Sequence, residues 1–217
     1  MNCVLVPVKA LEQGKSRLSV RLSPEERHAL SRAMLTDVVT SARSATTVDR
    51  VVVVSSDPSL LELARQFEVE AVDEGYPRGL NGAVAVGTEF CLQLGATAVL
   101  VLLADLPLVT AQDIERIFQQ TNGEPQIVVV PCKEGDGTNA LLRIPPEVVP
   151  TRFGGPSLAG HQQVARQYAV ACQVVNIPRI AFDVDSVEDL RWLASHAAET
   201  HTSHVLREFE VATRLES

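Results

Sequence analysis

Short aliphatic and β-branched runs alternate with helical patterns along almost the whole chain, and this alternation limits the possible folds more than any other feature. The runs occupy residues 4–8, 51–55, 69–72, 98–104, 127–131 and 172–177. Several of them are continuously apolar, as expected of strands that are covered by helices on both faces. Strands that alternate with helices predict an α/β fold with a doubly wound, mostly parallel sheet in a three-layer sandwich.

Capping signals mark where three of the helices begin. Ser23, Thr110 and Ser186 are each followed three positions later by an acidic residue. A hydroxyl and a carboxylate at this spacing bond reciprocally to the free amides of the first helical turn. The sequence therefore predicts helices that begin directly after these three residues.

The length of 217 residues suits one large α/β domain, which we expect to cover residues 1–195. Residues 131–160 are rich in Gly and Pro and predict a hairpin with loops, an insertion that shapes a pocket within that domain. Residues 196–217 are polar and predict a C-terminal tail, either a solvated helix or a flexible end.

Charge and composition restrict the partners. The net charge of −8 gives no general basic field for nucleic acid, so local cations, backbone amides or metal ions must hold an anionic substrate. The chain opens on a strand-like run without a signal peptide, and no apolar segment is long enough to span a bilayer. The four cysteines are scattered, which argues against a disulfide framework or a zinc site. We expect a cytoplasmic protein without nucleic-acid or membrane partners, and from its apolar helices and low charge density we consider a homodimer.

Candidate ligand-binding residues are sought after each strand, because ligands of open α/β sheets bind beyond the carboxyl ends of the strands. Pro7 and Lys9 follow the first strand, and Lys15 stands a few residues on, beside Gly14. This is no phosphate loop of the P-loop type, because Lys9 stands where that motif requires a glycine. The segment is either a solvated turn or a loop that grips a triphosphate, and its position at a strand end favours the second interpretation.

Aspartates stand at two further strand ends. Asp105 follows the apolar run 98–104, where it either bonds to a local turn or holds a metal. In an extended segment, Asp183 and Asp185 point to the same side. Two carboxylates repel by about 4 kcal/mol at ~4 Å with an effective dielectric near 20. A divalent cation removes this cost, and oxygen ligands suit magnesium. Alternatively, Asp185 or Ser186 caps the next helix.

The remaining polar turns have two interpretations each. Gly79-Leu80-Asn81 either presents amides to a nucleotide base or begins a helix with Asn81 as its cap. Thr138 in a glycine turn, Gly154, and Ser157 before a helical pattern are either turn and cap residues or donors to an anion at a helix N-terminus. His161 lies on that helical pattern, as His28 lies on an earlier one, and we expect both to be surface or packing residues.

Taken together, these segments resemble the guanylyltransferases that act on 2-phospho-L-lactate or phosphoenolpyruvate in making the deazaflavin coenzyme F-420. The resemblance covers residues 2 to about 192 and is most specific in the Gly-Asp-Gly-Thr-Asn and Ala-Asp-Leu-Pro-Leu blocks. The matching segments, in family order, are 7–9, 15–18, 33–38, 79–81, 104–108, 135–142, 152–154, Ser157 with His161, and 183–185.

The resemblance implies a glycosyltransferase-A-like nucleotidyltransferase fold, GTP as donor, and one or two magnesium ions. It implies a downstream transferase that uses the unstable product. The metal ligands that the resemblance implies are Asp105, Asp183 and Asp185. It implies that the acceptor's phosphate and carboxylate lie at Thr138, Gly154 and Ser157. It also implies that Lys9, Lys15 and Asp105 are catalytic and that the nucleotide lies near Pro7, Lys9, Lys15, Gly79, Leu80 and Asn81.

Two other functions compete with this one. A nucleotidyltransferase of the same fold that acts on a sugar phosphate or the molybdenum cofactor would share the first loop and Asp105, but gives no reason for residues 135–139 or 152–157. A non-catalytic, nucleotide-binding regulatory protein would be expected to lose its metal ligands, yet all three aspartates are present. The acceptor also stays open among phosphoenolpyruvate, 2-phospho-L-lactate and 3-phosphoglycerate.

Overall fold

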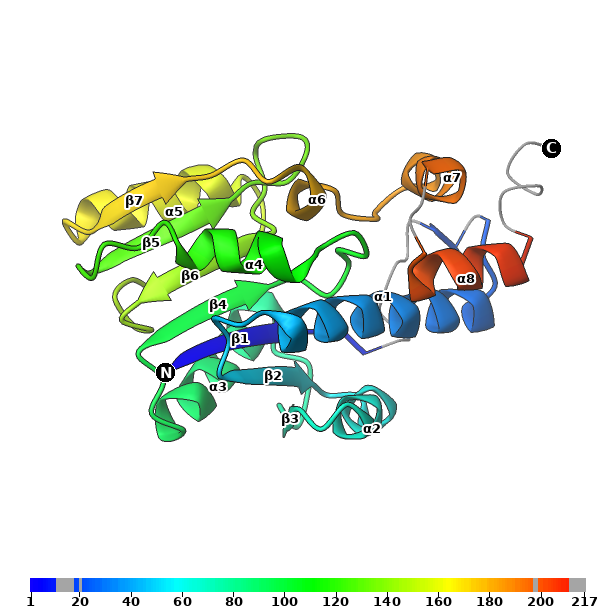
Figure 1. Ribbon diagram of the computed structural model, residues 1–217, viewed down its shortest axis with the longest axis horizontal. Helices are drawn as coiled ribbons and strands as arrows, with labels where there is room; N and C mark the ends of the chain where they lie inside the picture. Colours follow the sequence, from blue (N-terminus) through cyan, green and yellow to red (C-terminus); the bar gives the residue numbers. More distant parts are fainter. Residues whose placement is uncertain (11–17, 20, 197–198, 211–217) are drawn as a thin grey trace.

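A computed structural model describes residues 1–10, 18–19, 21–196 and 199–210. Seven strands form one sheet in the order β3-β2-β1-β4-β6-β5-β7, with every pair parallel except those that β6 makes with β4 and β5. The strands are β1 (Asn2–Pro7), β2 (Arg50–Ser55), β3 (Glu70–Asp73), β4 (Ala98–Leu102), β5 (Gln126–Val130), β6 (Ala140–Ile144) and β7 (Ala171–Val174). The doubly wound, mostly parallel sheet predicted from the alternating pattern is confirmed (Figure 1).

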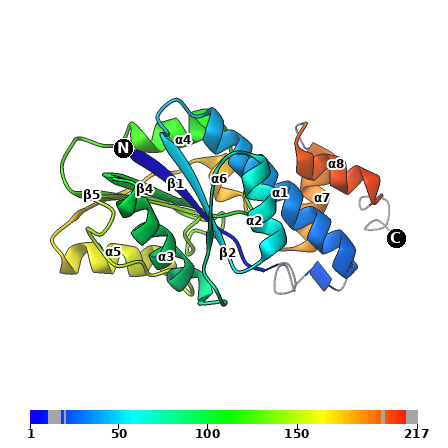
Figure 2. The same ribbon diagram turned by 90° about the horizontal axis from the view of Figure 1, so that it is seen from below.

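Helices cover both faces of the sheet, which gives three layers (Figures 1 and 2). Helices α1, α2 and α4 pack on one face, and α3 and α5 pack on the other. The helices are α1 (Pro24–Ser44), α2 (Pro58–Gln66), α3 (Gly79–Gln93), α4 (Ala111–Phe118), α5 (Ser157–Gln167), α6 (Pro178–Ala181), α7 (Val187–His196) and α8 (His201–Glu208). As predicted, Ser23 and Thr110 begin α1 and α4 with reciprocal capping boxes.

The continuously apolar strands are explained by this double covering. In β1, Val4 packs toward one helical layer while Cys3 and Leu5 pack toward the other. On the second face α3 comes unusually close to the sheet, because a Cβ at Gly87 would lie 2.3 Å from a methyl carbon of Leu5. Strand β1 is therefore buried between the two helical layers, and the residues that follow it emerge at the sheet edge.

Strand β6 lies inside the region that the sequence suggests is an insertion of hairpin and loops. It forms the hairpin with β5 and also pairs with β4, so residues 131–160 supply a central strand of the sheet. Because β6 is antiparallel to β4, with Ala140 opposite Leu102, the residues just before β6 lie beside the residues just after β4. This register brings the loop at 135–139 to the edge where the parallel strands end.

The C-terminal helices pack beyond the sheet against the first half of α1 (Figure 1). Asp37 on α1 accepts hydrogen bonds from the backbone N–H of His201 (2.8 Å) and from both the N–H (3.0 Å) and the hydroxyl (2.6 Å) of Thr202. Residues 201–208 therefore form a helix with buried contacts. Within the described part of the chain, no helix combines the length and apolar character needed to cross a membrane.

Candidate active site

The carboxyl ends of β1 and β4 define the centre of the site. These two strands are neighbours, and the chain runs from β1 to β2 on one side while β4 lies on the other, which makes the gap between them a topological switch point. Buried Pro7 ends β1, exposed Lys9 follows it, and Asp105 follows β4. Lys15, the second cation expected here, lies outside the described residues.

Three aspartates meet at this edge, and we call Asp105, Asp183 and Asp185 the aspartate cluster. The backbone N–H of Val184 donates to the carbonyl oxygen of Asp105 at 3.1 Å, which holds the two segments together. The Val184 side chain is fully buried, whereas Asp183 and Asp185 on either side of it are partly exposed. Burial, together with the nearby charges of Asp105 and Asp185, raises the pKa of Asp183. The cluster is thus an acidic site that favours a cation.

Asn139 orients the Asp183 carboxylate of the cluster. Its side chain is 3% exposed, and its amide nitrogen donates to the carbonyl oxygens of Ile180 (3.0 Å) and Ala181 (3.2 Å) and to the Asp183 carboxylate (3.2 Å). These bonds fix the turn before Asp183 and direct one oxygen of its carboxylate. The hydrogen bond from Asn139 also opposes the rise in the pKa of Asp183.

Lys133 and Asp189 hold the same segment from the other side. The Lys133 ammonium donates to the carbonyl oxygen of Asp183 (3.1 Å) and pairs with the Asp189 carboxylate. Asp189 also accepts from the backbone N–H groups of Asp185 (3.0 Å) and Ser186 (2.8 Å), while Ser186 Oγ accepts from Asp189 N (3.2 Å). Although burial of Asp189 works in the opposite direction, Lys133 and these donors lower its pKa. Helix α7 is therefore capped by Ser186 and Asp189 rather than by Asp185.

The aspartate cluster fits an open magnesium site better than a closed one. In the part of the chain that the structure describes, no three His, Cys, Asp or Glu side chains are grouped so that they could hold a metal ion by themselves. Magnesium, however, is usually bound through one or two carboxylates, with water and substrate phosphates completing the shell. The all-oxygen donors of Asp105 and Asp183 match this mode, in which the substrate supplies the missing ligands.

A group of neutral hydrogen-bonding side chains lies on the β6 side of the same edge, and we call Thr138, Ser157 and His161 the hydroxyl cradle. The Ser157 hydroxyl donates to Thr138 Oγ1 at 3.0 Å, and His161 Nδ1 lies 3.2 Å from the same oxygen. The exposed fractions are 4% for Thr138, 3% for Ser157 and 0% for His161. The cap role considered for Ser157 is wrong by one residue, because Pro156 occupies the N-cap position and Ser157 is the first residue of α5.

His161 connects the cradle to the next loop. Its Nε2 accepts a hydrogen bond from the backbone N–H of Arg152 at 3.0 Å, and its ring meets Phe153 edge-on with centroids 5.0 Å apart. Burial, aided by the positive charge of Arg143, lowers the pKa of His161 to about 4. The sequence predicts only a surface or packing residue here. The spacing could have indicated that His161 contacts the site, because residues four apart on a helix share a face and His161 follows Ser157 by four.

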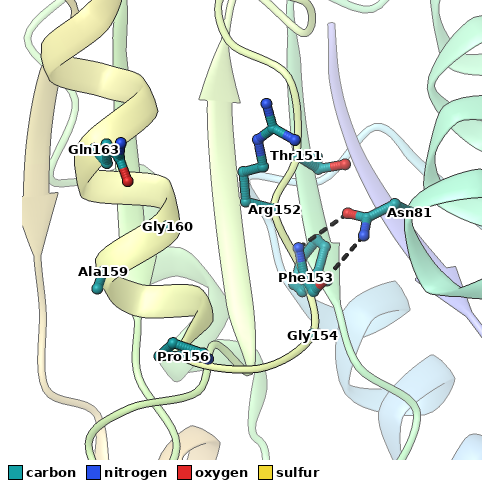
Figure 3. A pocket seen from close by; sticks show the side chains of 9 residues that line it. All are labelled: Asn81, Thr151, Arg152, Phe153, Gly154, Pro156, Ala159, Gly160 and Gln163. Carbon is teal, nitrogen blue, oxygen red and sulfur yellow. Dashed lines mark hydrogen bonds between the residues drawn. The ribbon is translucent and has the colours of Figure 1, made fainter.

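Asn81 ties helix α3 to the loop that carries Gly154 (Figure 3). Its amide nitrogen donates to the Phe153 carbonyl oxygen (2.8 Å), and its amide oxygen accepts from the Phe153 N–H (2.9 Å). Helix α3 begins at Gly79, with φ of +71°, so the alternative in which Asn81 caps the helix is wrong. Leu80, between them, packs partly buried against the second face of the core. Exposed Gly154 has φ of +98°, which favours glycine.

An open pocket of about 470 Å³ lies between this loop and α5 (Figure 3). It is lined by Asn81, Thr151, Arg152, Phe153, Gly154, Pro156, Ala159, Gly160 and Gln163. Of the three predicted acceptor residues, only Gly154 lines this pocket, while Thr138 and Ser157 bond to each other. Asn81 links the loop of Gly154 to the segment predicted to bind the nucleotide. Asn139 and Lys133 support the site and were not predicted as site residues, whereas Asp189 was predicted as the acid that caps α7 and has that role.

Comparison with known proteins identifies the family of this chain. The family described as "Guanylyl transferase CofC like" matches residues 2–217. The chain is 38% identical over 194 residues to a phosphoenolpyruvate guanylyltransferase of Sphaerobacter thermophilus, covering 89% of this chain and 92% of that protein. It is 32% identical over 213 residues to a 2-phospho-L-lactate guanylyltransferase of Methanothermobacter thermautotrophicus, covering 98% and 93%. Among solved structures, a nucleotidyl transferase from Methanothermobacter is similar in fold, with a TM-score of 0.70 at 16% identity over 96% of this chain and 99% of that one.

Proposed function

The chain belongs to the family of CofC-like guanylyl transferases, and from that premise we propose that it transfers GMP from GTP to a small phosphorylated carboxylic acid and releases pyrophosphate. The acceptor we propose is phosphoenolpyruvate or 2-phospho-L-lactate, the substrates in the names of its relatives. The product would enter the biosynthesis of coenzyme F-420 through a downstream transferase that consumes it. Since GTP and such acids are metabolites of the cytoplasm, we place the reaction there.

The observation that carries this proposal is the pairing of two opposite sites at one sheet edge. The hydroxyl cradle offers uncharged donors beside a helix N-terminus, where an anion is favoured. The aspartate cluster offers carboxylates where a cation is favoured. A phosphorylated acid at the first and a metal-bound triphosphate at the second would place two anions next to each other without uncompensated charge.

The proposed reaction is an in-line substitution at phosphorus. An oxygen of the acceptor's phosphate forms a bond to the α-phosphorus of GTP, and the bond from that phosphorus to the bridging oxygen of the β-phosphate breaks. The electron pair leaves with pyrophosphate. A phosphate monoester is already ionised near neutral pH, so no side chain must remove a proton, and the chain contributes position and charge compensation.

Each group of residues has a separate part in this scheme. Thr138, Gly154 and Ser157 would hold the phosphate and carboxylate of the acceptor, while Lys9 and Lys15 would offset charge on the triphosphate. The segment Gly79–Asn81, with Leu80 between them, would lie near the guanine base, and Pro7 near the nucleotide.

The metal requirement is also part of the proposal. Asp105 and Asp183, with Asp185 beside them, would hold one or two magnesium ions, which supply charge neutralisation for the attacking and leaving oxygens when bound. Asn139 keeps the Asp183 carboxylate turned toward that position. Lys133 and Asp189 fix the backbone on which Asp183 and Asp185 stand.

The decisive test is pyrophosphate release by the purified protein. The panel combines GTP or ATP with phosphoenolpyruvate, 2-phospho-L-lactate, 3-phosphoglycerate or a sugar phosphate, with magnesium present and with mass analysis of the products. We expect release with GTP and one of the two family acceptors, and its loss in Asp105→Asn while the thermal melt is retained. Release only with the sugar phosphate, or full activity of Asp105→Asn, would contradict the acceptor or the metal assignment respectively.

A further inference from the structure

The protonation of the His161 ring follows from the backbone N–H that faces it. The backbone N–H of Arg152 points at Nε2 from 3.0 Å, and a backbone N–H can only donate. Nε2 must therefore carry a lone pair. A neutral imidazole has one acceptor nitrogen and one N–H, so the proton is on Nδ1.

The ring then determines where the Thr138 hydroxyl can send its own hydrogen. Nδ1 lies 3.2 Å from Thr138 Oγ1, and because it carries a proton it cannot accept from that hydroxyl. The Ser157 hydroxyl donates to the same oxygen at 3.0 Å. Within the described residues, the structure gives the Thr138 hydrogen no protein acceptor, although Thr138 is only 4% exposed.

A buried hydroxyl that is surrounded by donors is suited to a ligand that only accepts hydrogen bonds. Phosphate and carboxylate oxygens are such acceptors, whereas an alcohol or an amine would bring a further hydrogen into the contact. Bonds to a charged acceptor are also roughly twice as strong as neutral ones. Leaving the Thr138 hydrogen without a partner would cost free energy in the unliganded protein, and an anion recovers that cost.

We propose that His161 is a positioning residue, which keeps Thr138 in the donor state and thereby selects an anionic group of the acceptor. This inference rests on the proposed function and goes beyond it by assigning the selectivity of the cradle to a residue that does not touch the substrate. Arg152 takes part through its backbone N–H, which donates to Nε2 and fixes the ring. The direction of hydrogen-bond donation in the cradle is thus fixed at the loop in Figure 3, whose Arg152 N–H donates to the ring, and the ring in turn constrains the Thr138 hydroxyl.

The first test reads the ring directly and needs no substrate. A long-range ¹H–¹⁵N spectrum of the wild-type protein reports which nitrogen of His161 carries the proton. We expect the Nδ1–H form across pH 5–9, since burial and the charge of Arg143 lower the pKa of this ring to about 4. The Nε2–H form, or a protonated ring at neutral pH, would overturn the inference.

The second test separates positioning from packing by a double-mutant cycle. His161→Phe keeps an aromatic ring against Phe153 and removes both nitrogens. Thr138→Val removes the hydroxyl. We expect each to raise the acceptor KM about 10- to 100-fold, as for the loss of a hydrogen bond to a charged group, with the GTP KM unchanged. If His161 acts through Thr138, the double variant is no worse than Thr138→Val alone.

Several outcomes would contradict the proposal. Additive losses in the double variant would mean that His161 has only a packing role, and Thr138→Ser, which retains the hydroxyl, must stay close to wild type. His204→Phe on α8, which is exposed, is the matched histidine control.

If wild-type protein released no pyrophosphate with any acceptor, the proposed function would fail. Titration with inorganic phosphate would then replace the kinetic measurement. Equal phosphate binding by wild type and His161→Phe would contradict the role of His161 independently of the proposed function.

Discussion

The hydroxyl cradle and the aspartate cluster lie on the same sheet edge but are built on opposite principles. The cradle is neutral, and its three side chains are at most 4% exposed and hydrogen-bonded to one another. The aspartate cluster is charged and partly exposed, and burial, together with the charges of Asp105 and Asp185, raises the pKa of Asp183. The neutral cradle leaves one hydroxyl hydrogen for an anionic ligand, whereas the like charges of the cluster need an added cation. The cradle should therefore control the acceptor KM, and the cluster should control kcat and metal affinity.

The largest effect that tests this division is expected from Asp183→Asn. The amide keeps the size of the side chain and removes the charge that would bind the metal. Since such a metal is worth several kcal/mol to the transition state, we expect kcat to fall about 1000-fold, with the acceptor KM little changed. Pyrophosphate release measures both, and Glu188→Gln on the exposed start of α7 is the matched control. A kcat within tenfold of wild type would contradict the assignment of metal binding to the cluster.

The same substitution has a second consequence in the metal-free protein. The folded state raises the pKa of Asp183, first through burial and then through Asp105 and Asp185, so the folded protein holds that proton more tightly than the unfolded chain does. Stability is then highest below the ordinary pKa of aspartate and falls as pH rises through the raised value. Denaturant unfolding against pH should show this fall in wild type and a weaker one in Asp183→Asn, while saturating magnesium should oppose it.

Asn139→Ala is expected to have the next largest effect, because it damages the support of the cluster without touching its charge. The substitution leaves the carbonyls of Ile180 and Ala181 and one carboxylate oxygen of Asp183 without their buried donor. We expect unfolding to become easier by about 2 kcal/mol and magnesium to bind about 10- to 100-fold more weakly, as for other residues that orient metal ligands. Calorimetric titration with magnesium and denaturant unfolding check the two parts. Unchanged metal affinity would show that Asn139 serves stability alone.

Lys133→Met should be milder, although Lys133 contacts the same segment. Its side chain is 31% exposed, so water screens the pair with Asp189, and we expect a loss of about 1 kcal/mol at most. Asp189 also keeps its bonds to the N–H groups of Asp185 and Ser186. We expect kcat to fall no more than about tenfold, less than the loss expected for Asn139→Ala. A fall as large as that of Asp183→Asn would give Lys133 a direct role at the triphosphate.

The sequence predicts parts of the molecule that depend on local pattern. The apolar runs and the capping spacings place most strands and several helix starts, and the ends of strands direct attention to Asp105. Strand β6 is harder to predict, because buried Arg143 interrupts its apolar character and bonds to Thr88 on α3. Asn139 and Asn81 could not be assigned as supports, since their partners lie about 40 and 72 residues away along the chain.

Asn81→Ala is expected to have the smallest effect, and it decides to which of the two sites Asn81 belongs. The resemblance places it at the guanine base, whereas in the structure both polar atoms of its side chain bond to the Phe153 backbone. If the structural contact dominates, loosening the loop should raise the acceptor KM about threefold to tenfold, as for the loss of about one net hydrogen bond, and leave the preference for GTP over ATP intact. If Asn81 reads the base, the GTP KM rises and ATP competes better. Asn81→Asp sharpens the choice, because a carboxylate still accepts from the Phe153 N–H but can no longer donate to its carbonyl. If the acceptor KM of Asn81→Asp lies between those of wild type and Asn81→Ala, Asn81 belongs to the acceptor site. If only the KM for GTP or the preference for GTP over ATP changes, Asn81 belongs to the nucleotide site.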